Sequence, residues 1–233
     1  MQYRTLGRTD IEVSVVCQGC WSLTTNDDLT WGATPREDAL GAIRTALDAG
    51  VTFFDTAEGY GNGESEELVA EAIGDRRKEM VLASKVSRGH LAPDRIKRCC
   101  EESLKRLRTD YIDLYQIHWP HPDYDMAAAV GAMVELREEG KIRAVGLSNF
   151  GTSFLADVPA DAGVVSNQVA YSLLFRTIEY EVLPACRQRD ICILPYSPIA
   201  QGLLAGKYAS PDDVPAGRAR TRMFSRQRPE AGH

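Results

Sequence analysis

Four side chains whose types suit proton transfer follow predicted buried strands of this chain. Asp55 and Tyr60 lie in FFDTAEGYG, Lys85 lies near the end of VLASKV, and His118 ends LYQIH. A tyrosine hydroxyl has a reference pKa of about 10, which is too high for easy proton transfer at neutral pH. A nearby ammonium group favours the phenolate and lowers that pKa, and a carboxylate beside the ammonium holds it charged and fixed. An imidazole can donate a hydrogen bond to a substrate oxygen, so the set suits protonation of a carbonyl oxygen as a hydride arrives.

Each of these residues alone has an ordinary structural explanation. An aspartate after a strand often caps a loop, and a tyrosine often packs with its hydroxyl in water. A lysine at a strand end is usually solvated, and a histidine is more often a hydrogen-bonded wall residue than a catalyst. The set becomes specific only if adjacent strands of one barrel direct all four side chains to one mouth, so the prediction depends on the fold.

An apolar strand, a polar loop and an amphipathic helix recur along the chain. Near-continuous apolar strands that alternate with helices indicate a buried parallel sheet, and the regular spacing indicates a repeated βα unit. The predicted strands are VSVVCQG, TFFDTA, MVLASKV, YIDLYQIH, IRAVGLS, VVSNQVA and ICILPYS. The predicted helices cover about residues 35–49, 65–74, 93–107, 126–139 and 178–189, with a shorter connection after Phe150.

Two α/β architectures fit this pattern: an open doubly wound sheet and a (β/α)8 TIM barrel. A dinucleotide-binding open sheet should show GxGxxG after its first strand, whereas this chain continues QGCWSLTTNDD, so we favour the barrel. Two short extended pieces around residues 7–10 predict an N-terminal β-hairpin that closes the barrel's bottom.

The number of strands is one short, because we find seven and a barrel needs eight. We therefore expect residues 1–233 to be a single barrel domain that is incomplete at its C-terminus, as part of a longer native chain. Natural truncation and closure of the barrel by a partner remain the alternatives.

Composition limits the classes of partner. The 233 residues are 44% hydrophobic, enough for a sizeable core, and the net charge is −6. The sequence shows no clustered basic face of the kind that binds nucleic acids. We interpret the basic run at 218–228 as a solvated tail. No apolar run is long enough to span a bilayer, and the first ten residues contain no secretion signal, so we expect a cytoplasmic protein.

The six cysteines predict neither a disulfide framework nor a metal site. Cys17 and Cys20 form a CxxC in an apolar strand without a second pair, so we interpret them as ordinary buried thiols. Cys99 and Cys100 are interpreted as packed helix residues. His118 and His121 lack a third ligand at suitable spacing, so no metal is expected.

Five stretches resemble, in order, the signatures of the aldo-keto reductase family: DTAEGYG, LASKV, LYQIH, GLSNF and YSPIAQGLLAGKY. The resemblance runs from Met1 to about Arg218 and implies a (β/α)8 barrel that reduces aldehydes or ketones with NADPH, reversibly. It implies that Tyr60 donates the proton, Lys85 lowers the pKa of Tyr60, and Asp55 pairs with Lys85. His118 would position and polarise the carbonyl.

The resemblance also implies a nicotinamide-binding set. NADP(H) is the expected cofactor, with NAD(H) not excluded, because the family segment that holds the adenosine 2′-phosphate has no counterpart here. Ser148, Asn149 and Gln168 match positions that bind the nicotinamide amide, and Tyr196 matches the aromatic residue that stacks on its ring. The family loop along the pyrophosphate and ribose is matched by Ser197, Pro198, Ile199, Gln201 and Lys207. Arg218 is a weaker match to a basic residue of the segment that covers the cofactor.

Aromatic residues are expected at the substrate mouth. Trp21 matches a family aromatic there and is assigned to both the cofactor and substrate sets, and Trp119 forms a second wall or is merely packed. Together with Tyr60 and His118 they would contact a small carbonyl or sugar substrate that the sequence does not name. The segment between strand one and the first helix, with Asp27, Asp28 and Trp31, is interpreted as a polar pocket wall or a surface loop.

Two other functions are also compatible with the sequence. One is a non-catalytic subunit that senses the nicotinamide cofactor for a partner, as potassium-channel β subunits do. His118 favours the enzyme over this reading, because the family histidine is replaced in that branch. The other is an inactive fragment that has all four residues Asp55, Tyr60, Lys85 and His118, here called the tetrad, but no working cofactor site. The oligomeric state is left open.

Overall fold

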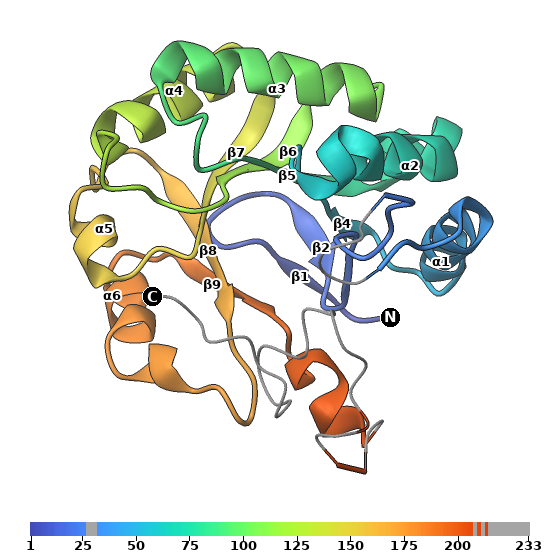
Figure 1. The fold of residues 1–233 in the computed structure, drawn as a ribbon. Coiled ribbons are helices and arrows are strands. Elements are labelled where there is room, and N and C mark those ends of the chain that lie inside the picture. The colour runs from blue at the N-terminus through green and yellow to red at the C-terminus, as the bar shows by residue number, and fades with distance from the viewer. Residues whose placement is uncertain (27–31, 207–208, 211–212, 214–233) are drawn as a thin grey trace.

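The computed structural model describes residues 1–26, 32–206, 209–210 and 213. Its main sheet has seven parallel strands that neighbour one another in sequence order. The sheet curves into a wall with helices along its outer side (Figure 1). This is the predicted barrel architecture with the predicted seven strands. The strands are β3 (Cys17–Gly19), β4 (Phe53–Asp55), β5 (Val81–Val86), β6 (Ile112–Ile117), β7 (Ile142–Ser148), β8 (Val164–Ala170) and β9 (Cys192–Tyr196).

The helices cover the outer face of this sheet, and the first four agree closely with their predicted ranges. A large core cluster lies between sheet and helices. No helix of the described ranges is both long and apolar enough to cross a membrane. The helices are α1 (Arg36–Asp48), α2 (Glu64–Ile73), α3 (Pro93–Leu107), α4 (Met126–Glu138), α5 (Thr152–Ala156) and α6 (Val182–Gln188).

The predicted last helix is too long at its start. A short 3₁₀ turn, η3 (Thr177–Glu179), comes first, and α6 begins only at Val182. Pro184 explains the difference, because proline has no N–H to donate and is tolerated in the first turn of a helix but not in its interior. A helix that began at residue 178 would place Pro184 inside it.

The first predicted strand, VSVVCQG, is divided between two sheets. Only Cys17–Gly19 joins the barrel, while Ser14 ends β2 (Glu12–Ser14), which pairs antiparallel with β1 (Tyr3–Thr5). The side chain of Ser14 accepts hydrogen bonds from the backbone N–H groups of Thr52 and Phe53 at 3.1 and 3.2 Å. These bonds anchor the hairpin to the start of β4, so the continuous apolar run is not one strand.

The hairpin closes the bottom of the barrel, as predicted. Leu6, Ile11 and Val13 are buried in a second core cluster together with inward-facing strand residues. Gly7 lies so close to β8 that a Cβ at this position would meet the carbonyl oxygen of Val165 at 2.8 Å. The interior at this end is therefore filled by apolar side chains, which leaves the other end for polar groups.

One expectation about the cysteines is wrong. Cys20 is buried, but Cys17 is exposed because, among the described strands, β3 lies at the edge of the sheet and pairs with β4 alone. Cys99 and Cys100 are both fully buried on α3, as predicted. All six cysteines are free.

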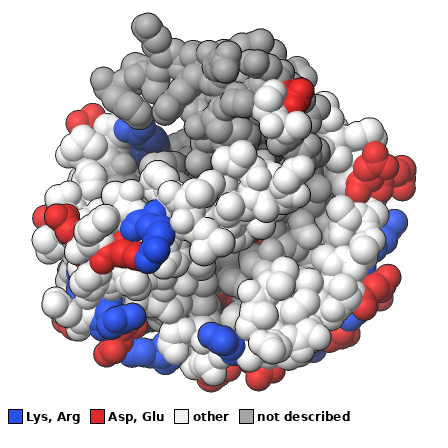
Figure 2. Space-filling view, turned by 90° about the horizontal axis from the view of Figure 1, so that it is seen from below, with Lys and Arg blue, Asp and Glu red and all other residues white. Residues whose placement is uncertain are grey.

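The surface carries charges of both signs. On the face shown in Figure 2, basic and acidic side chains lie next to one another around the edge, and the middle is mostly uncharged. Elsewhere in the described ranges charges also occur as pairs, such as Arg36 with Glu71 and Lys97 with Glu135. On that face the described charges therefore form a mixed rim rather than a basic patch.

Candidate active site

The four residues predicted to do chemistry meet at the C-terminal ends of three neighbouring strands. Asp55 ends β4, Lys85 is the second-last residue of β5, and His118 directly follows β6. Tyr60 begins the 3₁₀ turn η1 (Tyr60–Gly63), five residues after Asp55. The ammonium of Lys85 lies 3.2 Å from the Tyr60 hydroxyl, which lies 3.4 Å from Nε2 of His118.

Lys85 is a fully buried cation whose ammonium group is saturated with acceptors. It donates to Oδ1 of Asp55 at 2.5 Å, to the carbonyl oxygen of Thr56 at 2.8 Å and to the hydroxyl of Tyr60. An ammonium group has three donors, so each has a partner. Burial alone would lower the pKa of Lys85, but the charge of Asp55 and the neighbouring Tyr60 raise it above its usual value. Lys85 is therefore a fixed positive charge.

The pKa of Tyr60 differs in direction from the expectation. Burial raises it and is the largest effect, while the charge of Lys85 lowers it and that of Asp55 raises it again. The net result lies above the ordinary value of about 10, so the prediction of a lowered pKa is wrong for this state of the protein. Lys85 acts in the predicted sense but does not outweigh desolvation. Tyr60 consequently holds its proton at neutral pH.

His118 is a neutral imidazole. Burial and the charge of Lys85 lower its pKa to about 3. Its ring meets that of Tyr60 edge to face, with the centroids 5.5 Å apart. A neutral imidazole can still donate one hydrogen bond, so His118 and Tyr60 offer two donors side by side without a second positive charge.

The second oxygen of Asp55 is held by two amides. Gln116 and Gln168 donate from Nε2 to Oδ2 of Asp55 at 3.1 and 2.9 Å. Gln168 is one of the predicted cofactor residues, but Gln116 was missed. Its sequence signal is a lone amide in the apolar strand LYQIH, and it lies opposite Lys85 in the paired strands. Gly146 makes room for it, because a Cβ there would meet the Gln116 side chain at 2.8 Å.

The residues expected at the nicotinamide amide form one hydrogen-bonded group beside the tetrad. Asn149 donates to the carbonyl oxygen of His118 at 3.0 Å and to the hydroxyl of Ser148 at 2.9 Å. The Tyr196 hydroxyl donates to the Asn149 side-chain oxygen at 2.9 Å, and the Asn149 backbone N–H bonds to the Gln168 carbonyl oxygen. Gln168 also reaches Asp55, so it joins this group to the buried charges.

Residues 15–228 match the sequence model of the aldo/keto reductase family. The chain belongs to this family. It is 39% identical over 217 residues to the aldo-keto reductase YhdN of Bacillus subtilis, covering 89% of this chain and 65% of YhdN. It is 36% identical over 195 residues to the methylglyoxal reductase YeaE of Escherichia coli, covering 82% of this chain and 66% of YeaE. The chain thus spans just under two thirds of the length of both curated relatives.

Solved aldo-keto reductases share the fold. The thermostable aldo-keto reductase Tm1743, solved with the inhibitor epalrestat, superposes with a TM-score of 0.81 at 37% identity, over 89% of this chain and 76% of that one. An aldo/keto reductase of Klebsiella pneumoniae, solved with NADP and acetate, has a TM-score of 0.74 at 37% identity, over 84% of this chain and 67% of that one.

The aromatic residues expected at the substrate mouth are at least partly exposed at the surface. Trp21 is 38% exposed and stacks on Tyr60, with ring centroids 6.2 Å apart and planes 25° from parallel. Trp119, next to His118, is 46% exposed, so it is not a core residue. Trp21 therefore borders Tyr60 directly, and Trp119 lies outside the core beside His118.

The expected pyrophosphate loop follows β9 and has a strained backbone. Ser197, Ala200 and Gln201 have φ angles of 53°, 49° and 54°, a region that residues other than glycine rarely adopt. Pro198 and Ile199 are exposed. The side-chain oxygen of Gln201 is buried without a hydrogen-bond partner in the described ranges. Such strain and an unmet acceptor are typical of binding loops.

Five residues singled out in the sequence analysis lie outside the described residues: Lys207, Arg218, Asp27, Asp28 and Trp31.

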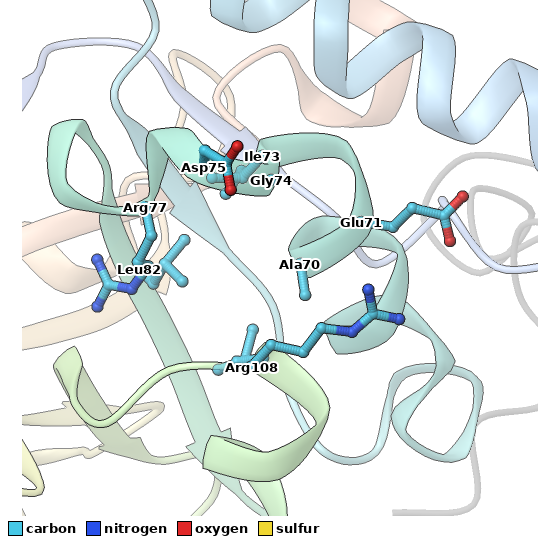
Figure 3. A pocket seen from close by; sticks show the side chains of 9 residues that line it. Ala70, Glu71, Ile73, Gly74, Asp75, Arg77, Leu82 and Arg108 are labelled. Carbon is cyan, nitrogen blue, oxygen red and sulfur yellow. The ribbon is translucent and has the colours of Figure 1, made fainter.

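Two cavities at the opposite end of the barrel are separate from this site. One of about 280 Å³ lies between the C-terminal ends of α2 and α3, where Figure 3 shows Arg77 and Glu71 extending away in opposite directions. The other, of about 380 Å³, is lined by the hairpin and by Arg143 among others. Arg77 and Arg143 each form an ion pair with Asp113 at 2.9 Å, so the charges of these two arginines are already balanced by Asp113.

Proposed function

We propose that this chain is an NADP(H)-dependent oxidoreductase that reduces aldehydes or ketones to alcohols, with Tyr60 as the general acid. The observation that carries the proposal is the line of contacts from Asp55 through buried Lys85 to the Tyr60 hydroxyl, with His118 3.4 Å beyond it. A structural ion pair alone would not need a tyrosine and a histidine at the mouth.

The proton step follows from the positions of these groups. The Tyr60 hydroxyl and Nε2 of His118 are 3.4 Å apart, so one carbonyl oxygen can accept hydrogen bonds from both. As negative charge develops on that oxygen, Tyr60 transfers its proton, and the ammonium of Lys85 stabilises the phenolate that remains. Asp55 keeps Lys85 charged and in place. In the reverse direction the phenolate accepts the proton of an alcohol.

The residues beside the tetrad suit a nicotinamide cofactor, which supplies the hydride when bound. Asn149 and Gln168 offer amide groups, and Tyr196 offers a ring, at the ends of adjacent strands. The strained loop with the unmet oxygen of Gln201 follows immediately. NADP(H) is favoured over NAD(H) because the Klebsiella pneumoniae relative was solved with NADP.

Small aldehydes are the proposed substrates. The relative YeaE is named a methylglyoxal reductase, and Trp21 stacked on Tyr60 narrows the approach to the proton donor. We therefore propose methylglyoxal as the first compound to test, with an aromatic aldehyde beside it. A ratio of kcat/KM values that favours the aromatic aldehyde strongly would argue against this substrate class and leave the reductase proposal intact.

The decisive experiment is NADPH oxidation by the purified protein with either aldehyde. Tyr60→Phe keeps the ring and removes the proton, so kcat should fall by about 10²–10⁴-fold while NADPH fluorescence still reports binding. Turnover by Tyr60→Phe within a few-fold of the parent would refute Tyr60 as general acid. Binding of NADPH without any turnover would support the cofactor-sensing subunit instead.

A further inference from the structure

Three side chains of different types, each able to ligate a metal ion, lie close together outside the proton-transfer set. Glu58 lies in the loop after β4, His90 in the loop after β5, and Cys99 on α3. Their ligand atoms all lie within 4.8 Å of one another. They are separated by 32 and 9 residues in the sequence, so no motif connects them. None of the three belongs to the proton-transfer set.

The spacing of these atoms is close to that of a tetrahedral zinc site. Bond lengths of about 2.0–2.3 Å from zinc to oxygen, nitrogen and sulfur place ligand atoms about 3.3–3.6 Å apart. Cys99 Sγ and His90 Nδ1 are 3.5 Å apart, and Glu58 Oε1 and His90 Nδ1 are 2.8 Å apart. The thiol and imidazole therefore fit already, and the carboxylate needs to move by about half an ångström.

Burial is also suited to an ion. The side chain of Glu58 is 7% exposed and Cys99 is fully buried, while the His90 side chain is 38% exposed and opens the cluster to solvent. A thiolate, a carboxylate and a neutral imidazole together balance the charge of a divalent cation. Sulfur and nitrogen ligands select zinc-like ions over magnesium and calcium.

We propose that Glu58, His90 and Cys99 bind a divalent transition-metal ion of the zinc class, with water as the fourth ligand. The Cys99 thiol proton leaves to solvent as the metal–sulfur bond forms, and His90 ligates through Nδ1 in its neutral form. Metal binding in this way needs no oxidant or reductant, because zinc keeps its oxidation state.

Without a metal, the three residues form a hydrogen-bonded link. Glu58 Oε1 accepts a hydrogen bond from the backbone N–H of Ser87 at 2.7 Å and contacts His90, and the Cys99 thiol is within hydrogen-bonding distance of His90 Nδ1 at 3.5 Å and hydrogen-bonds to Glu58. A bond from the Cys99 sulfur to a bound ion is therefore what separates a metal site from this hydrogen-bonded link.

A metal here would act on the segment that carries the proton donor. Glu58 lies between Asp55 and Tyr60, and its backbone N–H donates to the carbonyl oxygen of Lys85 at 3.3 Å. Binding would join this segment to α3 through Cys99. We expect the metal to raise the thermal unfolding temperature of the protein, since it binds the folded state.

Cobalt(II) is the probe, because a thiolate ligand gives it a charge-transfer absorption band. Purified, metal-free protein under reducing conditions should bind one equivalent at this site and show that band, and zinc should displace it. Cys99→Ser should abolish the band and weaken binding by about tenfold or more. Cys100→Ser is the matched control, because Cys100 is the adjacent, equally buried thiol of α3 and lies outside the cluster.

His90→Gln provides a second variant that a folding defect of Cys99→Ser would not compromise, since His90 is half-exposed. It should also weaken cobalt binding, whereas His121→Ala should not. The absence of a band in the folded parent, or a band that survives Cys99→Ser, would overturn the proposal. These readouts need no turnover, so they stand whether or not the protein reduces aldehydes.

Discussion

Gln116 and Lys85 lie opposite each other in the paired strands β6 and β5, and each holds one oxygen of Asp55. The carboxylate that fixes the buried ammonium is thus itself fixed from the other side. Gln168 holds the same oxygen as Gln116 and is also one of the residues assigned to the cofactor. Gln116 is therefore the side-chain partner of Asp55 that is assigned neither to proton transfer nor to the cofactor.

Removal of this amide should slow catalysis without preventing binding. Gln116→Leu deletes a hydrogen bond to a charged group, which contributes about 1.5–3 kcal/mol. We expect kcat to fall by roughly tenfold or more and KM for NADPH to stay within about twofold, as measured by steady-state kinetics. Ser166→Ala is the control, because its buried hydroxyl has no hydrogen-bond partner in the described ranges. Equal losses in both variants would point to packing rather than positioning.

Loss of the buried ammonium should damage both stability and activity. Lys85→Met leaves Asp55 as an uncompensated charge that is only 7% exposed. Breaking a buried pair in this way costs about 3–5 kcal/mol, measured as the free energy of unfolding in urea. Lys141→Met is the control, since that lysine lies in exposed ion pairs and should cost no more than about 1 kcal/mol. A similar cost for both lysines would contradict the argument.

His118 should stay neutral well into the acid range. Its pKa of about 3 in the folded protein lies below the unfolded value of about 6.5. Between these pH values the unfolded chain binds more protons, so this residue's contribution to stability is complete above pH 6.5 and falls as pH decreases toward 3. NMR titration should show one imidazole that does not titrate down to about pH 4.

The stability consequence is checked by a variant. His118→Phe should unfold with a smaller dependence on pH between about 6.5 and 4 than the parent protein, because the group that takes up the proton on unfolding is gone. An unchanged pH dependence, or an imidazole that titrates near pH 6 in each of the four histidines, would show that His118 is not desolvated as described.

The bottom of the barrel should affect stability alone. Asp113 is 1% exposed and accepts hydrogen bonds from Arg77, Arg143 and the backbone N–H of Leu82, each at 2.9 Å. Asp113→Asn removes the charge that both arginines face, so the free energy of unfolding should fall by about 3 kcal/mol. The kcat of the folded fraction should change less than twofold, because the network lies at the opposite end from Tyr60. A selective loss of kcat would instead reveal coupling between the two ends.

Much of the architecture follows from local pattern. The strands of the apolar runs at β5, β6, β7 and β8 lie where the sequence predicts them, because burial on both faces requires an unbroken apolar segment. The hairpin was also predictable from the turn residues around Gly7. The exceptions have local causes as well: Ser14 bonds to β4 and ends the hairpin strand early, and Pro184 delays α6.

The tetrad was accessible from sequence because strand ends in a barrel share one mouth, so Asp55, Lys85 and His118 needed only correct strand ends. The net pKa of Tyr60 was not accessible, since it depends on how completely the folded protein excludes water. Gln116 was missed for a related reason: a polar residue in an apolar strand becomes meaningful only when the register places it against a particular partner.

The amino-acid sequence by itself determined the order of strands and helices, the family and the identity of the groups at the strand ends. These depend on periodicity and residue type within short segments. Tertiary structure alone decided which oxygen of Asp55 each amide holds, how burial outweighs Lys85 at Tyr60, and that Glu58, His90 and Cys99 share one site. Those properties depend on distances and desolvation between segments far apart in the chain, which only the curvature and register of the folded sheet establish.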